Sequence, residues 1–284
     1  MRKAQLIHIC GDFHGEWDKL NIFINRNIRQ SKQVRALAAA YDELEVLILQ
    51  CGDFGYWPYT LPMPEYMRTG TGADYRRFED SIRNQVDFLK GGQVKIYWAD
   101  GNHENHDALD ALEAEHPAEA FIQTMPGVFF APFGSILPLI DGTRVMFCGG
   151  AESGPLDIQS CVPGVSWWQQ EGIDDKDMAR LPNPQATRVD WIISHTGPHA
   201  FETVGKGIEY RKNRESSKCH LERILSDYHP TRWWFGHYHA LREGWDKGCR
   251  WTLLDRIGNG SGRKWVDTIL LTTEQAEGDH DETA

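Results

Sequence analysis

Five short apolar runs in this chain each lead into residues that can bind a metal ion. The runs are Leu6–Cys10, Leu44–Gln50, Val94–Trp98, Val189–Ile193 and Trp233–Phe235. Apolar runs of this length predict buried strands, and the carboxyl ends of parallel strands meet at one sheet edge, where open α/β folds bind their ligands. The polar residues that follow the runs are Asp12, His14, Asp53, Asn102, His103, His195, His237 and His239. The sequence therefore predicts an α/β fold that gathers these side chains at one edge.

Size and composition fit a globular protein with a substantial core. The chain has 284 residues, of which 40% are hydrophobic and 11% aromatic. No internal repeat or clear interdomain linker interrupts it, so we expect one domain over residues 1–273. Residues 274–284 are acidic and almost without apolar side chains, which predicts a disordered tail.

The charge balance limits the partners that this chain can have. Lys and Arg number 30 against 41 Asp and Glu, for a net charge of −11. This excess argues against broad nucleic-acid binding, which needs a positive surface, and leaves nucleic acid possible only as a substrate. A small phosphorylated substrate remains compatible, because bound divalent ions reverse the local charge.

Location can also be predicted from composition. The amino terminus enters the first strand without an apolar signal region, and no apolar run approaches the ~18 residues of a membrane span. Six cysteines are dispersed and form no C-x-x-C pair. We therefore expect a cytoplasmic protein with reduced thiols and no membrane association. No feature indicates an oligomeric state.

Apolar spacing predicts the main helices and the remaining strands. Helices are expected over residues 16–29, 74–90, 107–116 and 217–228, and short strands over 128–130, 136–140 and 144–148. Asp141-Gly142 predicts a hairpin turn between the last two strands. Residues 56–72 contain three prolines and four aromatics and predict a long ordered loop.

Each polar motif has an ordinary structural explanation when it is taken alone. Asp12 and His14 could form a turn after a strand, and His195 could be a satisfied polar residue at a strand end. His237 and His239 alternate and could share a face for packing. Coincidence does not easily explain all five at equivalent places, so the set favours a metal centre.

The order of these residues from Asp12 to His239 resembles the calcineurin-like metallophosphoesterase superfamily, in particular its bacterial and phage members. The resemblance implies a four-layer αββα sandwich, in which two mixed β-sheets are flanked by helices and a dinuclear metal site lies at the C-terminal edge of the strands. Carried over by position, one ion would be held by Asp12, His14, Asp53 and His239. The other would be held by Asp53, Asn102, His195 and His237, so that Asp53 bridges, with His103 beside the metals.

The chemistry of these residue types agrees with the implied roles. Imidazoles with carboxylates suit two divalent transition-metal ions, with manganese expected first and iron, zinc, cobalt or nickel as alternatives. The resemblance implies hydrolysis of phosphodiester or phosphomonoester bonds by a hydroxide shared between the ions. His103 would protonate the leaving oxygen or stabilise its charge.

Other residues are candidates for substrate contact. The protein Ser/Thr phosphatase branch would place Asp and Arg where this chain has Tyr56 and Trp57, so a dedicated protein phosphatase is disfavoured. The segment Gly164–Glu171 resembles one in some bacterial and phage members. Its Trp167 or Trp168, with Tyr56 and Trp57, could wall a cleft and stack a base, or could simply pack against a sheet edge.

Two further candidates lie between His195 and the final histidines. Arg211 belongs to a dense basic run that could neutralise substrate phosphate or could be a solvated surface loop. His199 is a second possible contact in the same connection. Two functions besides phosphoester hydrolysis of a small substrate stay open at this point. They are a nuclease acting on DNA or RNA and a non-catalytic scaffold that keeps the fold.

Overall fold

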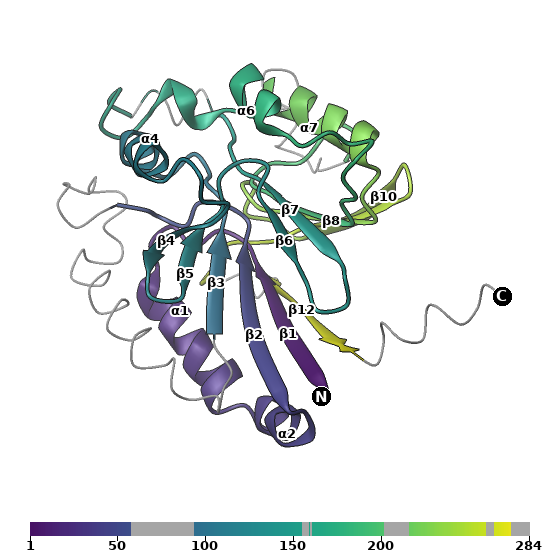
Figure 1. Cartoon of the computed structure of the whole chain (residues 1–284). Helices are drawn as coiled ribbons and strands as arrows, with labels where there is room; N and C mark the ends of the chain where they lie inside the picture. The colour runs from purple at the N-terminus through teal and green to yellow at the C-terminus, as the bar shows by residue number, and fades with distance from the viewer. Residues whose placement is uncertain (58–93, 155–158, 160, 202–215, 260–263, 274–284) are drawn as a thin grey trace.

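The computed structural model describes residues 1–57, 94–154, 159, 161–201, 216–259 and 264–273. Two six-stranded sheets stack face to face, and helices cover the outer face of each sheet (Figure 1). This is the predicted four-layer arrangement of helix, sheet, sheet and helix, so the expected fold class is confirmed.

The first sheet has the strand order β12-β1-β2-β3-β5-β4. Its four central strands are parallel, and β12 and β4 pair antiparallel at the two edges. The strands are β1 (Lys3–Cys10), β2 (Glu43–Gln50), β3 (Val94–Trp98), β4 (Ile122–Met125), β5 (Val128–Phe130) and β12 (Val266–Thr272). The carboxyl ends of β1, β2 and β3 consequently share one edge.

The second sheet repeats this plan with the order β10-β11-β9-β8-β7-β6. Strands β11, β9, β8 and β7 are parallel, and β10 and β6 are antiparallel edge strands. The strands are β6 (Ile136–Pro138), β7 (Arg144–Cys148), β8 (Trp191–Ser194), β9 (Arg232–Phe235), β10 (Arg242–Asp246) and β11 (Cys249–Leu253). The β6–β7 hairpin turns at Asp141-Gly142, as predicted.

Period-two alternation of apolar side chains creates the layers. Ile7 and Ile9 of β1 point between the sheets and pack in one cluster with Phe147 of the second sheet. Leu6 of the same strand points to the outer face, where it belongs to the cluster that includes Trp17 and other helix residues. Successive strand residues point to opposite faces, so one strand serves both layers.

Helices close the two outer faces of the sandwich (Figure 1). The first sheet is covered by α1 (Trp17–Ile24), which continues as a π-helical turn (Asn25–Arg29), and by α2 (Lys32–Ala40), with α4 (His106–Glu115) packed near β5. The second sheet is covered by α7 (Ser216–Tyr228) and α6 (Asp175–Arg180). A 3₁₀ turn spans Gln169–Glu171. None of the helices in the described ranges is long and apolar enough to cross a membrane.

Three of the four predicted helices lie within the described residues, and all three are observed. The expected helix at 16–29 is observed as α1 and its π turn, and those at 107–116 and 217–228 are observed as α4 and α7. Helices α2 and α6 were not predicted. Only Val34 and Leu37 are large apolar residues in α2, and α6 has only six residues and buries none of them. Strand β4 was also missed, and the sequence predicted only a pair of strands after β9, where the structure has β10, β11 and β12. The predicted helix at 74–90, nearly all of the predicted loop at 56–72 and the acidic tail at 274–284 lie outside the described residues.

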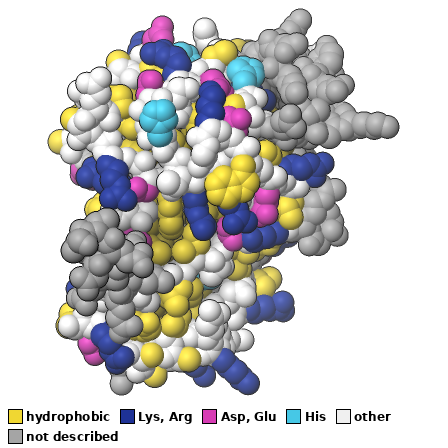
Figure 2. Space-filling model, turned by 90° about the vertical axis from the view of Figure 1, so that its right-hand side faces the viewer, with side chains coloured by type: hydrophobic (Ala, Val, Ile, Leu, Met, Phe, Trp, Pro, Cys, Tyr) yellow, Lys and Arg dark blue, Asp and Glu magenta, His cyan; other side chains and the backbone are white. Residues whose placement is uncertain are grey.

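Charged side chains are mixed over the surface. On the face shown in Figure 2, Lys and Arg side chains are interspersed with Asp and Glu rather than gathered in one basic area. Several exposed lysines form ion pairs, including Lys3 with Glu43 at 2.7 Å and Lys264 with Asp267 at 2.6 Å. The six cysteines are all free thiols, as expected.

Candidate dinuclear metal centre

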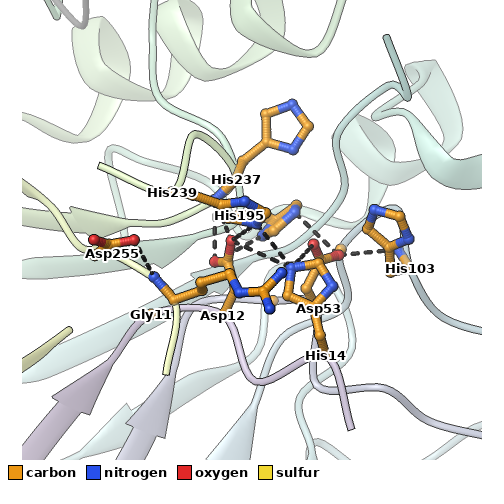
Figure 3. Close-up of polar contacts among 12 residues, drawn as sticks. Gly11, Asp12, His14, Asp53, His103, His195, His237, His239 and Asp255 are labelled. Atoms are coloured by element: carbon orange, nitrogen blue, oxygen red, sulfur yellow. Dashed lines mark hydrogen bonds and ion pairs between the residues drawn. The ribbon is translucent and has the colours of Figure 1, made fainter. Parts of the chain in front are cut away.

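The residues that follow five parallel strands meet where the two sheets face each other. Asp12 and His14 follow β1, Asp53 follows β2, and Asn102 and His103 follow β3 of the first sheet. His195 follows β8, and His237 and His239 follow β9 of the second sheet. Figure 3 shows Asp12, Asp53, His14, His195 and His239 gathered together, with His103 to one side. The structure therefore brings together all eight residues that the sequence placed at the sheet edge.

One group of donors contains Asp12, His14, Asp53 and His239. Their candidate ligand atoms all lie within 4.8 Å of one another. The Nε2 atoms of His14 and His239 are 2.8 Å apart. Asp12 Oδ2 is 3.2 Å from Nε2 of His239, and Asp53 Oδ2 is 3.4 Å from Nε2 of His14. Two imidazole nitrogens and two carboxylate oxygens thus point at one small volume.

The second group shares Asp53 with the first. Asn102 Oδ1 lies 3.1 Å from Nε2 of His195 and 3.0 Å from Nδ1 of His237. Nε2 of His195 is also 3.2 Å from Oδ1 of Asp53. Asp53 therefore directs Oδ2 to one group and Oδ1 to the other, as a bridging carboxylate would.

Hydrogen bonding at His195 tests whether this donor set fits a cation. Nδ1 of His195 lies 2.8 Å from the carbonyl oxygen of Cys51, which can only accept, so Nδ1 carries a proton. In neutral His195 the lone pair is then on Nε2, facing the oxygens of Asn102 and Asp53. Three electron-pair donors that converge in this way need a positive charge between them, so the residues present fit a bound metal ion.

Burial and neighbouring charges shift the pKa values of the clustered residues. Burial by itself lowers the pKa of His195, but Asp53 and Asp12 raise it to about 10. Burial raises the pKa of Asp53, whereas His195, His103 and His14 bring it well below its usual range. Burial holds the pKa of His14 well below its usual value, which keeps that imidazole in the neutral form that binds metals.

Backbone conformation aims the ligands at the centre. Among the described residues, six other than glycine have positive φ, and four of them are predicted ligands. These are His14 (φ 48°), Asp53 (φ 55°), His237 (φ 71°) and His239 (φ 46°). Each such conformation costs ~1–3 kcal/mol and persists only where the surroundings enforce it. The backbone conformation at these four residues therefore lowers the stability of the fold while it directs their side chains toward the site.

Two glycines allow the loops to approach one another. A Cβ atom on Gly101 would lie 2.3 Å from Oδ1 and 2.4 Å from the backbone nitrogen of Asp53. A Cβ atom on Gly236 would lie 1.8 Å from Oδ1 of Asp12. The space that any other residue would fill is occupied by the carboxylates of the site.

Glu104 joins two of the ligand loops and was not predicted. It is fully buried, and its oxygens accept hydrogen bonds from the backbone nitrogens of Gly55 (3.0 Å) and Gly101 (2.8 Å). Burial and the charge of Asp53 raise the pKa of Glu104 well above its usual value. Its position directly after His103 was the available signal, but only the fold shows which loop it reaches.

His103 lies at the side of the cluster. Its backbone nitrogen donates to Oδ1 of Asp53 at 2.9 Å, and its ring centroid is 4.9 Å from that of His14 (Figure 3). The side chain is half-buried, whereas Asp12, Asp53 and His195 are almost completely buried. His103 is therefore beside the donor groups and open toward solvent.

The sequence was compared with models of known protein families. Residues 6–241 match the family model described as calcineurin-like phosphoesterase. The chain belongs to the calcineurin-like phosphoesterase family. Membership supports metal-dependent hydrolysis of phosphoesters in general, and the family generally binds two divalent metal ions.

Solved structures show similarity at low identity. Phosphopantetheinyl hydrolase from Mycobacterium tuberculosis is 12% identical with a TM-score of 0.46, over 94% of this chain and 96% of that one. A putative 5'-nucleotidase from Staphylococcus aureus is 14% identical with a TM-score of 0.45, over 94% of this chain and 51% of that one. The GAP50 anchor of the Plasmodium inner membrane complex is 9% identical with a TM-score of 0.43, over 95% and 81%. No curated protein matches.

Three of the four aromatic residues predicted to stack a substrate are buried inside the protein. Tyr56 is 8% exposed and its ring centroid lies 5.4 Å from that of Trp98 in the core. Trp57 and Trp168 are buried against each other at 5.7 Å. This burial supports the packing alternative for these three side chains. Trp167 is half-buried, and its contact with a substrate stays a prediction.

Of the two candidates from the later connection, the structure describes only His199. His199 is exposed, and its Nε2 lies 3.5 Å from Sγ of Cys219 in α7. Arg211 lies outside the described residues. Contact of either residue with substrate therefore stays a prediction.

A cavity of about 810 Å³ adjoins the loop after β3, but none of the predicted ligands lines it. Its charged lining residues are Asp100, Asp110, Glu113, Glu152, Asp174, Asp177, Lys176 and Arg180. Burial, with Asp177 and Glu113 nearby, raises the pKa of Asp100 to about 7. Arg180 pairs with Glu113 at 2.6 Å. This predominantly acidic cavity is unsuited to a phosphate group, so the substrate site is better sought at the metal centre.

Proposed function

We propose that this protein is a dinuclear metal-dependent phosphoesterase that hydrolyses phosphodiester or phosphomonoester bonds. The observation that carries the proposal is the convergence of imidazole, carboxylate and amide donors around Asp53. Nε2 of His195 faces Oδ1 of Asn102 and Oδ1 of Asp53, while Oδ2 of Asp53 faces the second donor group. Such a set suits two cations that share one carboxylate.

The two ions would be held by the sets inferred from the sequence. Asp12, His14, Asp53 and His239 would bind one ion, and Asp53, Asn102, His195 and His237 would bind the other. Mixed nitrogen and oxygen donors favour manganese or another divalent transition metal over calcium or magnesium. Two such ions supply Lewis acidity toward phosphoryl oxygens and lower the pKa of water at the site.

The residues of the chain would orient the reaction. Asn102 contributes an oxygen without adding negative charge, so the centre keeps more of the positive charge that attracts a phosphoryl group. His103 lies beside the donor groups with a half-buried ring and would deliver a proton to the leaving oxygen. Its backbone bond to Asp53 holds the backbone of His103 next to the bridging carboxylate.

A small phosphorylated substrate is favoured over a long nucleic acid. The net charge is −11, which opposes the approach of a long polyanion. A long polyanion would need a continuous basic track beside the site. The free cysteines further support a cytoplasmic setting.

The test is hydrolysis by protein that has been stripped of metal and reloaded. Bis-p-nitrophenyl phosphate and p-nitrophenyl phosphate would be compared with Mn²⁺, Fe²⁺, Zn²⁺, Co²⁺ and Ni²⁺, and bound metal would be counted. We expect two ions per chain and metal-restored turnover, both lost in Asp53→Ala. The ratio of diester to monoester activity then selects the substrate class. Two bound ions without turnover of either ester or of labelled oligonucleotides would favour a scaffold, and failure to bind two ions would refute the proposal.

A further inference from the structure

Behind Asn102, on the side away from the imidazoles, two buried polar side chains continue its hydrogen bonding. Nδ2 of Asn102 donates to Oγ of Ser153 at 3.1 Å, and Oγ of Ser153 donates to Oε2 of Glu171 at 2.6 Å. The exposed fractions are 4% for Asn102, 9% for Ser153 and 1% for Glu171. Three side chains from separate parts of the sequence thus form one shielded chain that ends at a predicted ligand.

Among the described residues, three hydrogen-bond donors contact the carboxylate of Glu171. Besides the Ser153 hydroxyl, Oε2 accepts from the backbone nitrogen of Ser153 at 3.2 Å, and Oε1 accepts from that of Trp168 at 3.1 Å. Burial raises the pKa of Glu171 to about 7. Above that pH the carboxylate is ionised and can only accept, so the hydroxyl hydrogen of Ser153 then points toward Glu171. Oγ of Ser153 then offers only lone pairs to Asn102. The amide of Asn102 must therefore turn its NH₂ end to Ser153.

We propose that Glu171 is a positioning residue that determines, through Ser153, which end of the Asn102 amide faces the metal centre. The two ends of an amide have nearly the same shape, so packing alone does not choose between them. With the observed direction, Oδ1 faces His195 and His237, where an oxygen ligand is needed. The reverse direction would present two N–H groups and remove a ligand. This inference rests on the proposed function, because it concerns the second metal ion.

The surrounding segment delivers Glu171 to this position. Residues 169–171 form a 3₁₀ turn, in which the Glu171 side chain is held by the Trp168 nitrogen and its backbone carbonyl by the nitrogen of Ala151 at 2.8 Å. Trp168 is anchored by packing on Trp57. The segment Gly164–Glu171, noted in the sequence for its tryptophans, thus has a structural purpose in placing a carboxylate behind a ligand.

The first experiment compares Glu171→Gln with the parent protein. Glutamine has the same shape but can donate from Nε2, so Ser153 can reverse and the direction of Asn102 is no longer imposed. We expect the second Mn²⁺ to bind ~10–100-fold more weakly, while the first keeps its affinity, as measured by calorimetric titration of stripped protein. Glu152→Gln is the matched control, because Glu152 also accepts two hydrogen bonds nearby, from Ser216 and Ser217, but has no link to Asn102.

A second pair of variants separates direction from simple damage. In Asn102→Asp, residues 102 and 171 both only accept, and one Ser153 hydrogen cannot serve both, so binding of the second ion should weaken. When Glu171→Gln is added, the amide NH₂ at position 171 can donate to the Ser153 hydroxyl, which can then donate to the carboxylate at position 102. We therefore expect Glu171→Gln to lower the affinity for the second ion in the parent protein and to raise that affinity in the Asn102→Asp variant. A merely structural role would lower affinity in both.

The outcomes separate this inference from the proposed function. Absence of two metal ions in the parent would refute the proposed function and, with it, this inference. Two ions in the parent with unchanged affinity in Glu171→Gln, or the same sign of effect in both backgrounds, would overturn the positioning role alone. If Glu171→Gln does not fold, Ser153→Ala interrupts the chain at its middle and should weaken the second ion equally. An unchanged second affinity in Ser153→Ala would also overturn the inference.

Discussion

Replacing Gly101 by alanine should separate the two loops that carry Asp53 and Asn102. The added Cβ would meet the backbone nitrogen of Asp53 at 2.4 Å and Cδ2 of His195 at 2.8 Å, whereas ordinary contact begins near 3.4 Å. A clash with backbone cannot be relieved by rotating a side chain, so the loops must move apart by about 1 Å. Both metal-binding sets contain Asp53, so the displacement reaches the whole centre.

The size of the effect follows from this displacement. Overpacking in a close-packed region costs ~1–3 kcal/mol of folding free energy. A shift of about 1 Å in reacting groups costs ~100-fold in rate, and here it also spoils ligand spacing. We therefore expect Gly101→Ala to remain folded, to bind the two ions more weakly and to lose at least ~100-fold in kcat/KM toward the better of the two p-nitrophenyl esters.

Gly142→Ala provides a control with similar strain far from the clash. Gly142 has φ +87° in the β6–β7 hairpin, and an added Cβ would meet nothing within 4 Å. Its left-handed backbone makes alanine unfavourable by ~1–2 kcal/mol, a loss similar to that expected for Gly101→Ala. Urea denaturation, metal counting and ester hydrolysis would be measured for both. Wild-type metal content and turnover in Gly101→Ala, or an equal loss of both in Gly142→Ala, would refute the reasoning.

Three further outcomes test other parts of the molecule. Burial lowers the pKa of His8 from 6.5 to about 4, so the stability supplied by the neutral ring is complete above pH 6.5 and is lost as pH falls toward 4. By pH 5 the free energy of unfolding should have fallen by about 2 kcal/mol. Urea denaturation at pH 7 and pH 5 should show this fall in the parent protein and not in His8→Gln. An equal fall in both proteins would contradict the reasoning. His103→Ala should keep both ions while kcat falls ~100–10,000-fold in steady-state assays, and unchanged kcat would remove its proposed role. Trp168→Ala should lower the free energy of unfolding by ~3–5 kcal/mol because it exposes Trp57, and a selective rise in KM without loss of stability would instead support substrate stacking.

The sequence by itself determined the parts of this protein that depend on periodicity and strand ends. Apolar runs such as Val94–Trp98 predicted strands with the observed bounds, and the donors after each run predicted a common edge. These inferences work because side-chain alternation and the direction of parallel strands are local or nearly local properties. Helix α7, which buries several apolar side chains, was predicted for the same reason, whereas α2 has only two large apolar residues and α6 only six residues in all.

Tertiary structure alone decided how the pieces meet. Glu104 stands next to His103 in the sequence, yet its role depends on Gly55, which lies on another strand's loop. Trp57 and Trp168 looked equally suited to substrate or core until their mutual burial became visible. The direction of Asn102 depends on Glu171, 69 residues further along the chain. Hydrogen bonds and close contacts between distant segments are set by the packing of the whole sandwich, and no local pattern in the sequence encodes them.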